Sequence, residues 1–526
     1  MQTQHIGIID MGSNSIRFVI YQVDSSACYR EIQNLKVAAR LSTFIDEEQN
    51  MSNEGIKVIL NTLKRFELVA KDYEFTALRG VATAAVRNAS NRDEILAEIK
   101  KHSRFPIEIL DESAEAYYGY LAVTNATSFN EGVTIDIGGG STEITYFENR
   151  ELLYSHSFPF GAVTLKQTFV AGDTPTKEEM KKIREYIRDV LYSLPWLKNK
   201  EVPLIGIGGT ARNTALVHQA RINYPLSGLH QYQMNLTAIT KVRDYLSTLS
   251  IKKREKVDGL SKDRADIIIP AMSVFEECLT YMNSHNFHIS YRGLRDGLFY
   301  EHLLGNIDVT HFPNVVEESF YQFTHNYQLN REHQHRIGVL SAFLLNELFQ
   351  HHSNSKSTVS ENDMNLLKRG ASVFYIGRKV DPESASQHSF YLLANQSIDG
   401  FTHKERLATA FLASFKSKSQ LKIFANNLSD FLSKDELKKY ELLGSILRFA
   451  YGLNISGRNI VSRLEVSHLT KTALYLTAYH DGDAYFEAFE AGKYKKHLEK
   501  ALKKTIHLDF IDESRESDEF RPAKSF

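Results

Sequence analysis

The chain has 526 residues, of which 42% are hydrophobic and 24% charged, so it is too long for one core and has the composition of a soluble globular protein. A formal net charge of −1 excludes a general attraction to polyanions, and any polyanion site must be a local basic patch. The two cysteines, Cys28 and Cys278, give no disulfide framework, and neither a signal-peptide pattern nor a membrane-spanning apolar run is found. These features predict a cytoplasmic protein.

The first predicted element is a β-hairpin near the start of the chain. An apolar run leads into Asp10, a turn of small polar residues follows, and a second apolar run begins at Phe18. The turn consists of Gly12, Ser13, Asn14 and Ser15. Arg17 also lies within the hairpin, just before the second apolar run. Such a turn exposes main-chain N–H groups and hydroxyls that can bind a phosphate.

An α/β pattern continues to about residue 125. We expect an amphipathic helix over residues 57–66, a buried strand at 75–83, a helix at 92–101 capped by Asn91, a strand at 106–110 and a helix that starts near Glu112. The sequence therefore predicts a first α/β domain at residues 1–125.

The hairpin pattern returns in the middle of the chain. Asp136 again precedes a turn of small residues, Gly138, Gly139, Gly140 and Ser141. Glu143 flanks the turn on its other side, before a returning strand that begins at Ile144. We then expect a helix over 176–191 with a Thr176–Glu179 capping box, a strand at 203–207 that ends in Gly208 and Gly209, and a helix over 265–282. This predicts a second α/β domain at 126–305, and two related halves imply a cleft between them.

The last part of the chain has a different pattern. From about residue 314, helical periodicity places Ile337, Leu340, Leu344, Leu345 and Leu348 on one helix face, and we expect an all-helical domain at 314–450. A strand over 473–477 and a basic helix near 493–504 predict a small C-terminal α/β domain at 451–515. The polar end from Asp512 is expected to fray.

Four motifs together resemble the signatures of the Ppx/GppA exopolyphosphatases. They are the two Asp-containing turns, the run Gly208-Gly-Thr210 and the run Gly293-Leu-Arg-Asp-Gly297. The resemblance implies two actin-like (ribonuclease H-like) domains with a cleft between them, followed by an HD-like helical domain and a small α/β domain. It implies a phosphoanhydride hydrolase that releases the terminal phosphate of inorganic polyphosphate, with guanosine pentaphosphate (pppGpp) as the alternative substrate.

The resemblance also implies roles for single residues. Glu115 matches the base that orients the attacking water, although the family commonly has a glycine and paired glutamates here, which leaves Glu112 as a rival. Arg87 matches the active-site arginine that neutralises the transferring group, and we expect Arg17 either to bind phosphate or to face solvent. Arg295 is expected to hold the domain junction by an ion pair.

A metal site is expected at the second hairpin. Magnesium prefers oxygen ligands and is usually bound by few carboxylates together with substrate phosphates. Asp136 and Glu143 flank the glycine turn, and Asp10 lies at the matching place of the first hairpin, so we expect these three carboxylates to hold Mg²⁺. The phosphates are then expected at Ser13, Asn14, Ser15, Arg17, Gly138, Gly139, Gly140, Ser141, Gly208 and Gly209.

Three alternatives concern the remaining features. A working HD site needs an adjacent His-Asp pair, whereas the expected place has Phe374 and Tyr375, so we expect a degenerate metal site and a packing or dimer role, with a homodimer as the assembly. The lysines from Lys493 to Lys504 are expected either to guide a long polyphosphate or to form a solvated face. A kinase or chaperone-like ATPase and a non-enzymatic phosphate sensor are the other functional hypotheses.

Overall fold

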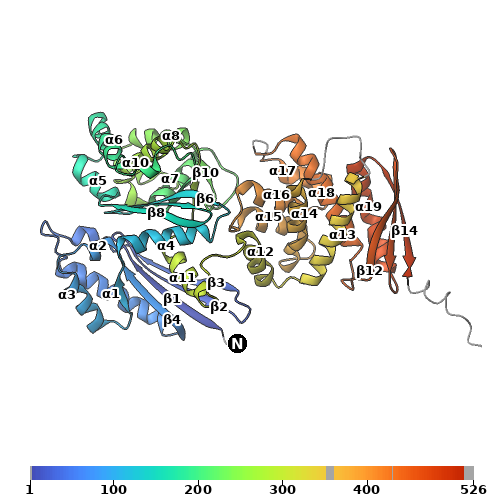
Figure 1. The fold of residues 1–526 in the computed structure, drawn as a ribbon, viewed down its shortest axis with the longest axis horizontal. Helices are drawn as coiled ribbons and strands as arrows, with labels where there is room; N and C mark the ends of the chain where they lie inside the picture. The colour runs from blue at the N-terminus through green and yellow to red at the C-terminus, as the bar shows by residue number, and fades with distance from the viewer. Residues whose placement is uncertain (1–2, 351–359, 429–430, 514–526) are drawn as a thin grey trace, which may run out of the picture. The chain divides into compact units, whose positions relative to one another are not determined.

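The computed structural model describes residues 3–350, 360–428 and 431–513 (Figure 1). The chain forms two compact units. Unit 1 comprises Met1–Tyr224, Gly228–Ser319 and Asp399–Phe401, and unit 2 comprises Pro225–Ser227, Phe320–Ile398 and Thr402–Phe526. The two α/β halves expected from the sequence both lie in unit 1.

A five-stranded sheet forms the first half of unit 1, in the order β3-β2-β1-β4-β5. Its strands are β1 (Gln4–Met11), β2 (Ile16–Val23), β3 (Tyr29–Val37), β4 (Phe75–Ala82) and β5 (Ile107–Ile109). Its helices are the 3₁₀ helix η1 (Leu41–Phe44), α1 (Asn53–Ala70), α2 (Ala84–Arg87), α3 (Arg92–His102) and α4 (Glu112–Thr124). β1 pairs antiparallel with β2 and parallel with β4.

The second half contains a six-stranded sheet in the order β10-β11-β9-β6-β7-β8. Its strands are β6 (Glu131–Ile137), β7 (Thr142–Glu148), β8 (Glu151–Phe158), β9 (Leu204–Ile207), β10 (Gln233–Met234) and β11 (Phe287–Ile289). Its helices are α5 (Ala162–Phe169), α6 (Lys177–Leu191), η2 (Pro195–Leu197), α7 (Gly208–Arg221), α8 (Leu236–Ser247), α9 (Ile251–Arg254), η3 (Lys262–Arg264), α10 (Ile268–Met282) and α11 (Leu294–Gly305).

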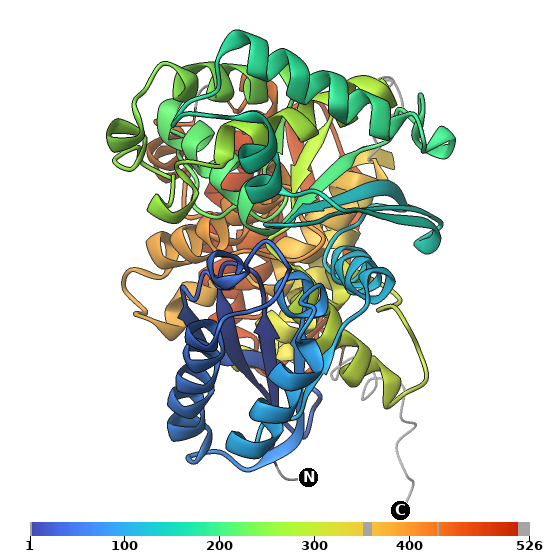
Figure 2. The same cartoon turned by 90° about the vertical axis from the view of Figure 1, so that its left-hand side faces the viewer.

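The two sheets repeat one topology. The order β8-β7-β6-β9-β11 corresponds strand by strand to β3-β2-β1-β4-β5, and the hairpin is antiparallel and the next pair parallel in both. Figure 2 shows the halves one above the other, with the first half in blue below and the second in green above. The repeat of the hairpin pattern in the sequence is therefore part of a repeat of the whole sheet.

Alternating apolar side chains bury both faces of the first sheet. Ile9 and Met11 point to the cluster that contains α1 and α3, whereas Ile6 and Ile8 point to the cluster that contains α4 and α11. Figure 1 shows these helix pairs on opposite sides of the strands. A sheet covered on both faces needs apolar side chains at successive positions, which explains the continuous apolar run before Asp10.

Helix α4 lies in the core that the two sheets share. Its apolar side chains belong to one buried cluster with Ile8 of β1, Phe147 of β7 and Ile207 of β9. The helix is apolar around most of its circumference after its first turn, which is typical of a buried helix. The first turn of α4 is polar, with Glu112 and Glu115. Glu115 lies near the two hairpin turns, at the same end of the strands.

Most predicted elements of unit 1 are confirmed, and one predicted cap is wrong. Thr176 and Glu179 form the expected capping box at α6, with Thr176 N–H donating to Glu179 Oε2 at 2.6 Å. Asn91 precedes α3 but makes no side-chain cap bond. Its amide instead accepts from Met51 N–H at 2.9 Å and donates to Met51 O at 3.0 Å, because this backbone offers both a donor and an acceptor.

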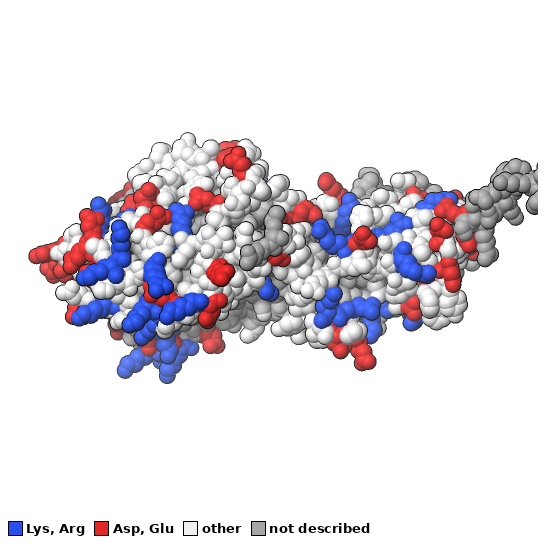
Figure 3. Space-filling view, turned by 90° about the horizontal axis from the view of Figure 1, so that it is seen from below, with Lys and Arg blue, Asp and Glu red and all other residues white. Residues whose placement is uncertain are grey.

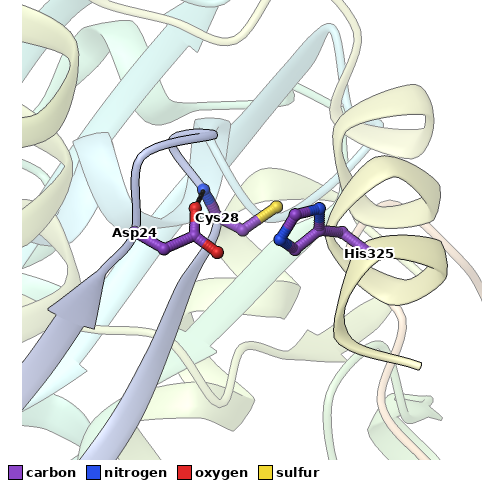
Figure 4. Close-up of side chains that lie close together, drawn as sticks. All are labelled: Asp24, Cys28 and His325. Atoms are coloured by element: carbon purple, nitrogen blue, oxygen red, sulfur yellow. Dashed lines mark hydrogen bonds between the residues drawn. The ribbon is translucent and has the colours of Figure 1, made fainter. Parts of the chain in front are cut away.

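The turn between β2 and β3 is closed by a carboxylate. Asp24 Oδ1 accepts from the N–H groups of Ser26 at 2.8 Å and Cys28 at 3.0 Å, and Figure 4 shows the Asp24 carboxylate beside the backbone nitrogen of Cys28. Both cysteines of the chain are buried, and they form no disulfide with each other.

Unit 2 is helical at first and then contains a small sheet. Its helices are α12 (Val315–Asn326), α13 (Arg331–Gln350), α14 (Glu361–Ser372), η4 (Ile376–Lys379), α15 (Ala385–Asn395), α16 (His403–Ala413), α17 (Lys418–Ala425), α18 (Lys434–Gly452) and α19 (Tyr485–Leu502). Its strands are β12 (Val461–Leu469), β13 (Ala473–His480) and β14 (Thr505–Asp512). The first residues of α12, up to Ser319, belong to unit 1. The five residues predicted on one face of α13 are all buried. Most of the expected polar end lies outside the described residues.

Charges of both signs are mixed on the surface. Figure 3 shows Lys and Arg interspersed with Asp and Glu on the face that it presents, as the near-zero net charge suggests. Among the helices that the structure describes, none has the length and hydropathy that crossing a membrane requires.

Candidate active site

The two hairpin turns have the same backbone geometry and line one cavity. Gly12 N–H donates to Ser15 O at 3.1 Å, and Gly138 N–H donates to Ser141 O at 3.0 Å. The cavity has a volume of about 400 Å³ and is walled mostly by polar groups of both halves. The sequence repeat therefore builds two opposed turns around a single space.

Most of the predicted site residues meet in this cavity. Its wall includes Asp10, Ser13, Asn14, Ser15, Arg17, Glu115, Asp136, Gly138, Gly139, Ser141, Glu143, Gly208 and Gly209. Two predicted residues, Arg87 and Gly140, do not line it. The residues come from strands and helices far apart in the chain, so only the fold brings them together.

Glu115 lies at the cavity wall, whereas its rival Glu112 does not. The side chain of Glu115 is 19% exposed, and that of Glu112 is 46% exposed. Asp111 caps α4 by accepting from Ala114 N–H at 2.7 Å, which fixes the first turn of the helix from which Glu115 projects. The geometry favours Glu115 over Glu112 as the group that can reach a bound water.

Arg87 holds Glu115 from behind. Its Nη1 donates to Glu115 Oε2 at 2.8 Å and to Leu110 O at 2.9 Å, and its Nη2 lies 3.6 Å from Glu112 Oε1. The guanidinium is buried beside the cavity and not in its wall. In this structure Arg87 contacts the carboxylate of Glu115, and its contact with a phosphate stays a prediction.

Buried carboxylates form one side of the cavity. Asp136 and Glu143 are directly opposite each other in the β6–β7 pair, and Ser157 of β8 donates to Glu143 Oε1 at 3.1 Å. Burial, and after it the nearby Glu115, raises the pKa of Glu143 well above its ordinary value. Burial likewise raises the pKa of Asp10 and of Asp136, although nearby arginines oppose the shift.

This set of carboxylates fits a hard divalent cation. Oxygen ligands of negative charge suit Mg²⁺. A cation would offset both the burial that chiefly raises the pKa values of Glu115 and Glu143 and the repulsion from neighbouring carboxylates that adds to it. Within residues 3–350, 360–428 and 431–513, no three carboxylates of this cavity have oxygens within 4.8 Å of one another.

Gly208 allows Asp136 to approach the start of α7. Gly208 has a φ of +76°, and a Cβ at this position would lie 2.1 Å from Asp136 Oδ1. A residue with a side chain would therefore be strained in its backbone and would displace the carboxylate. The glycine run expected as a turn is in fact the first turn of α7, and Gly208 and Gly209 line the cavity.

Several cavity residues were not predicted from the sequence. Among them are Lys36, Thr83, Asn213, Ser261, Arg264, Tyr291 and Arg292. Lys36 lies opposite Arg17 in the β2–β3 pair, and Arg264 lies on the 3₁₀ turn η3, where no motif marks it. Such residues carry no signal in one sequence, because only their position across a sheet or a loop directs them to the cavity.

Arg295 has both the expected contact and an additional position. Its Nε lies 3.6 Å from Asp10 Oδ2, the ion pair expected at the domain junction, and the side chain also lines the cavity. Together with Arg17 it opposes the effect of burial on the pKa of Asp10. Arg17 itself has its pKa lowered to about 10, chiefly by burial and then by Arg295. Arg17 is half-buried, lines the cavity, and also donates through Nη1 to Asn34 Oδ1 at 3.3 Å.

In unit 2, aromatic rings lie at the position where a working HD domain would have its His-Asp metal pair. Phe374 and Tyr375 stack with centroids 4.4 Å apart, and Tyr451 lies 5.6 Å from Tyr375. Arg448 donates to the Tyr375 hydroxyl and His333 contacts Asn454, with 3.0 Å between His333 Nδ1 and Asn454 Nδ2. These groups satisfy one another, which agrees with a packing role.

The lysines near the end of the chain make local contacts. Lys493 Nζ lies 3.2 Å from Glu490 Oε1, and Lys495 Nζ donates to Ile506 O at 2.7 Å. Lys504 Nζ donates to the carbonyl of Lys471 at 2.9 Å. These contacts favour the solvated, locally paired face over a path for polyphosphate.

The chain is similar to known phosphatases along most of its length. The model of the Ppx/GppA phosphatase family matches residues 19–306, and that of Ppx/GppA phosphatase, domain III, matches residues 315–482. A guanosine-5'-triphosphate,3'-diphosphate pyrophosphatase from Aeromonas salmonicida (strain A449) is 25% identical over 425 residues, which is 79% of this chain and 81% of the relative.

Two solved structures resemble the chain over a little more than half its length. An exopolyphosphatase from Cytophaga hutchinsonii ATCC 33406 is 25% identical, with a TM-score of 0.54, and covers 57% of this chain and 98% of that one. A Ppx/GppA family member from Aquifex aeolicus is 25% identical, with a TM-score of 0.52, and covers 59% of this chain and 100% of that one.

Proposed function

Because the chain belongs to the Ppx/GppA phosphatase family, we propose that it is an exopolyphosphatase, which hydrolyses the terminal phosphoanhydride of inorganic polyphosphate and releases phosphate. The observation that carries the proposal is the single cavity in which two opposed phosphate-type turns, a buried glutamate and an arginine-rich wall meet. A chain of phosphates offers charge for the arginines and a terminal group for the turns.

The terminal phosphate is held by the two turns. Their main-chain N–H groups and the hydroxyls of Ser13, Ser15 and Ser141 donate to its oxygens, and Arg17 adds a charged donor. Asp136 and Glu143, with Asp10 opposite, are the residues that would hold Mg²⁺. When bound, this ion supplies positive charge that stabilises the phosphate oxygens and the leaving group.

Glu115 acts as the base. Burial raises its pKa to about 7, with Arg87 opposing the shift and Asp136 adding to it, so the carboxylate is poised to accept a proton near neutral pH. A water bound to Glu115 attacks the terminal phosphorus in line with the bridging oxygen. A new P–O bond forms, the bridging P–O bond breaks, the water proton passes to Glu115, and the shortened chain leaves with the electron pair.

The test is phosphate release from polyphosphate by purified wild-type protein and by Glu115→Gln. We expect kcat to fall by about 10²–10⁴-fold, the usual contribution of a positioned base. Glu112→Gln is the matched control on the same helix turn and is expected to retain most of the activity. Equal turnover by wild type and Glu115→Gln would overturn the role of Glu115.

The second candidate substrate is pppGpp, and one feature of the cavity favours it. Tyr291 is 53% exposed and Leu216 is 38% exposed, and both line the cavity, with the Arg212 guanidinium 5.5 Å from the Tyr291 ring centre. An exposed ring beside a phosphate site is a surface on which a base can stack. Comparing kcat/KM for long polyphosphate and for pppGpp separates the two, and Tyr291→Ala should reduce only the value for pppGpp.

The finer description of the fold belongs to the same proposal. The doubled sheet and the cavity between its halves support two actin-like (ribonuclease H-like) domains. The helical stretch of unit 2, with aromatic rings in place of a His-Asp pair, supports an HD-like domain without a metal site. The homodimer stays a prediction, which sedimentation of the purified protein tests.

A further inference from the structure

A carboxylate from the second half lies on the first phosphate turn. Asp263 is part of η3, and its Oδ2 accepts from Asn14 Nδ2 at 2.9 Å. The same Oδ2 is 3.9 Å from Nζ of Lys36, which lines the cavity. Asp263 therefore occupies two groups, one amide donor and one cation, that face the space where a phosphate chain must lie.

The turn that carries Asp263 is anchored on its own half. Ser261 donates to Asn213 Oδ1 through both its N–H and its hydroxyl, each at 2.7 Å, and Arg264 Nη1 donates to Thr210 Oγ1 at 3.2 Å. Both partners belong to α7. The turn is thus fixed at both ends, and it places the carboxylate of Asp263 against Asn14 of the first half.

The surroundings keep this carboxylate charged. Its side chain is 16% exposed, and the bond from Asn14, with Lys36 and Arg264 nearby, outweighs the effect of burial, so the pKa of Asp263 lies below its ordinary value. At neutral pH a negative charge therefore lies directly beside Asn14 and Lys36, two residues of the cavity wall. A polyanion entering this space is repelled by that charge and must also compete for Asn14 and Lys36.

We propose that Asp263 competes with the phosphate chain for Asn14 and Lys36 and thereby weakens the binding of polyanions in the cavity. This inference rests on the proposed function, because it assigns a phosphate chain to the cavity. Its consequence is a site that binds substrate less tightly than its cations alone would allow. Removing the charge should then lower KM and leave kcat unchanged, since Asp263 does not touch the reacting atoms.

The experiment compares Asp263→Asn and Asp263→Ala with wild type. Asp263→Asn keeps an oxygen that accepts from Asn14 and removes only the charge, so it is expected to fold as wild type does. Tripolyphosphate binding to the metal-free protein is measured by calorimetry, and KM and kcat are measured with long polyphosphate and Mg²⁺. We expect both variants to bind tripolyphosphate roughly 5–10-fold more tightly, with a difference that shrinks at high salt.

The matched control is Asp266→Asn. Asp266 lies three positions further along, and its Oδ2 is 3.4 Å from Lys166 Nζ, which does not line the cavity, whereas the partners of Asp263, Asn14 and Lys36, do. This variant removes the same charge from nearly the same place and is expected to bind as wild type does. An equal gain in Asp266→Asn would show a general charge effect and overturn the role of Asp263.

The outcomes for the inference and for the proposed function are distinguishable. Unchanged or weaker tripolyphosphate binding in Asp263→Asn overturns the inference, whatever the turnover. Absence of polyphosphate turnover in wild type overturns the proposed function, whereas tighter binding in Asp263→Asn would still support the competition. Weaker binding in both variants would show that Asp263 closes the cavity around the substrate instead of competing with it, which also overturns the inference.

Discussion

The two hairpins have the same backbone hydrogen bond across the turn, but the rows of side chains that begin at their aspartates have opposite net charge. In the first sheet, Asp10, Arg17 and Lys36 lie side by side across β1, β2 and β3. In the second sheet, the equivalent row across β6, β7 and β8 is Asp136, Glu143 and Ser157. The first row has two cations and one carboxylate, whereas the second has two carboxylates and no cation.

This difference divides the work of the cavity. The row of the first sheet offers cationic partners for phosphate, and the row of the second sheet offers oxygen ligands for a divalent cation. In the proposed function, the residue opposite the aspartate, Arg17 in one hairpin and Glu143 in the other, determines whether the hairpin binds phosphate or the divalent cation. Substitutions in either row are expected to impair one of these two roles.

The largest effect is expected from the carboxylate row. Glu143→Gln removes one charge from the proposed ion site and leaves an acceptor for Ser157, so we expect kcat to fall by roughly 100-fold and the Mg²⁺ requirement to rise. The measurement is initial rate of phosphate release against Mg²⁺ concentration. An unchanged Mg²⁺ dependence would contradict the assignment of the ion to this row.

The matched change in the first row is Arg17→Gln. Arg17 occupies the position that Glu143 occupies in the other hairpin, and it donates to phosphate in the proposal. We expect KM for polyphosphate to rise by about 10-fold, the value of one charge-assisted bond, with kcat nearly unchanged. If Arg17→Gln lowered kcat and Glu143→Gln raised KM, the division of roles between the hairpins would be reversed.

A substitution at Gly208 tests whether the position of Asp136 in the second row depends on the absence of a side chain at residue 208. Gly208→Ala forces a positive φ on alanine and places Cβ against Asp136 Oδ1, so we expect a loss of roughly 1–3 kcal/mol in the free energy of unfolding and a lower affinity for Mg²⁺. Chemical denaturation and the Mg²⁺ titration measure the two effects. Gly172→Ala, where a Cβ meets nothing within 4 Å, is the control and should change neither.

The smallest effect concerns stability and pH. Folding raises the pKa of Glu143 above the ordinary value of 4.5, so the folded state binds more protons and the metal-free protein loses stability as pH rises from about 4.5 through the higher folded pKa. Glu143→Gln should reduce this loss, by roughly 2–4 °C in the melting temperature. Asp10→Asn should change it less, because Arg295 and Arg17 offset the burial of Asp10.

The measurement is thermal unfolding in chelator between pH 5 and pH 8. Added Mg²⁺ should restore stability at the upper end in wild type and not in Glu143→Gln. A larger effect of Asp10→Asn than of Glu143→Gln would place the uncompensated charge in the first hairpin.

Much of the site was predictable because its residues are adjacent in motifs. Asp10 with its turn and Asp136 with its turn are local patterns of strand and turn residues, and the structure brings both to one cavity. Glu115 was identified by resemblance and lies at the wall because α4 is buried in the core that the two sheets share. Asn91 shows the limit of local reasoning, since Met51 from another segment takes its amide.

The sequence by itself determined the repeated hairpins, the apolar strands that cover both faces of a sheet, and the change to helices after residue 314, because periodicity and turn chemistry are local. The tertiary structure alone decided that Lys36 and Arg264 face the cavity, that Arg87 holds Glu115, and that Asp263 lies on Asn14. These contacts join residues on different strands, loops and halves. Their geometry depends on sheet register and on how the halves pack, and neither is written in the residues of one segment.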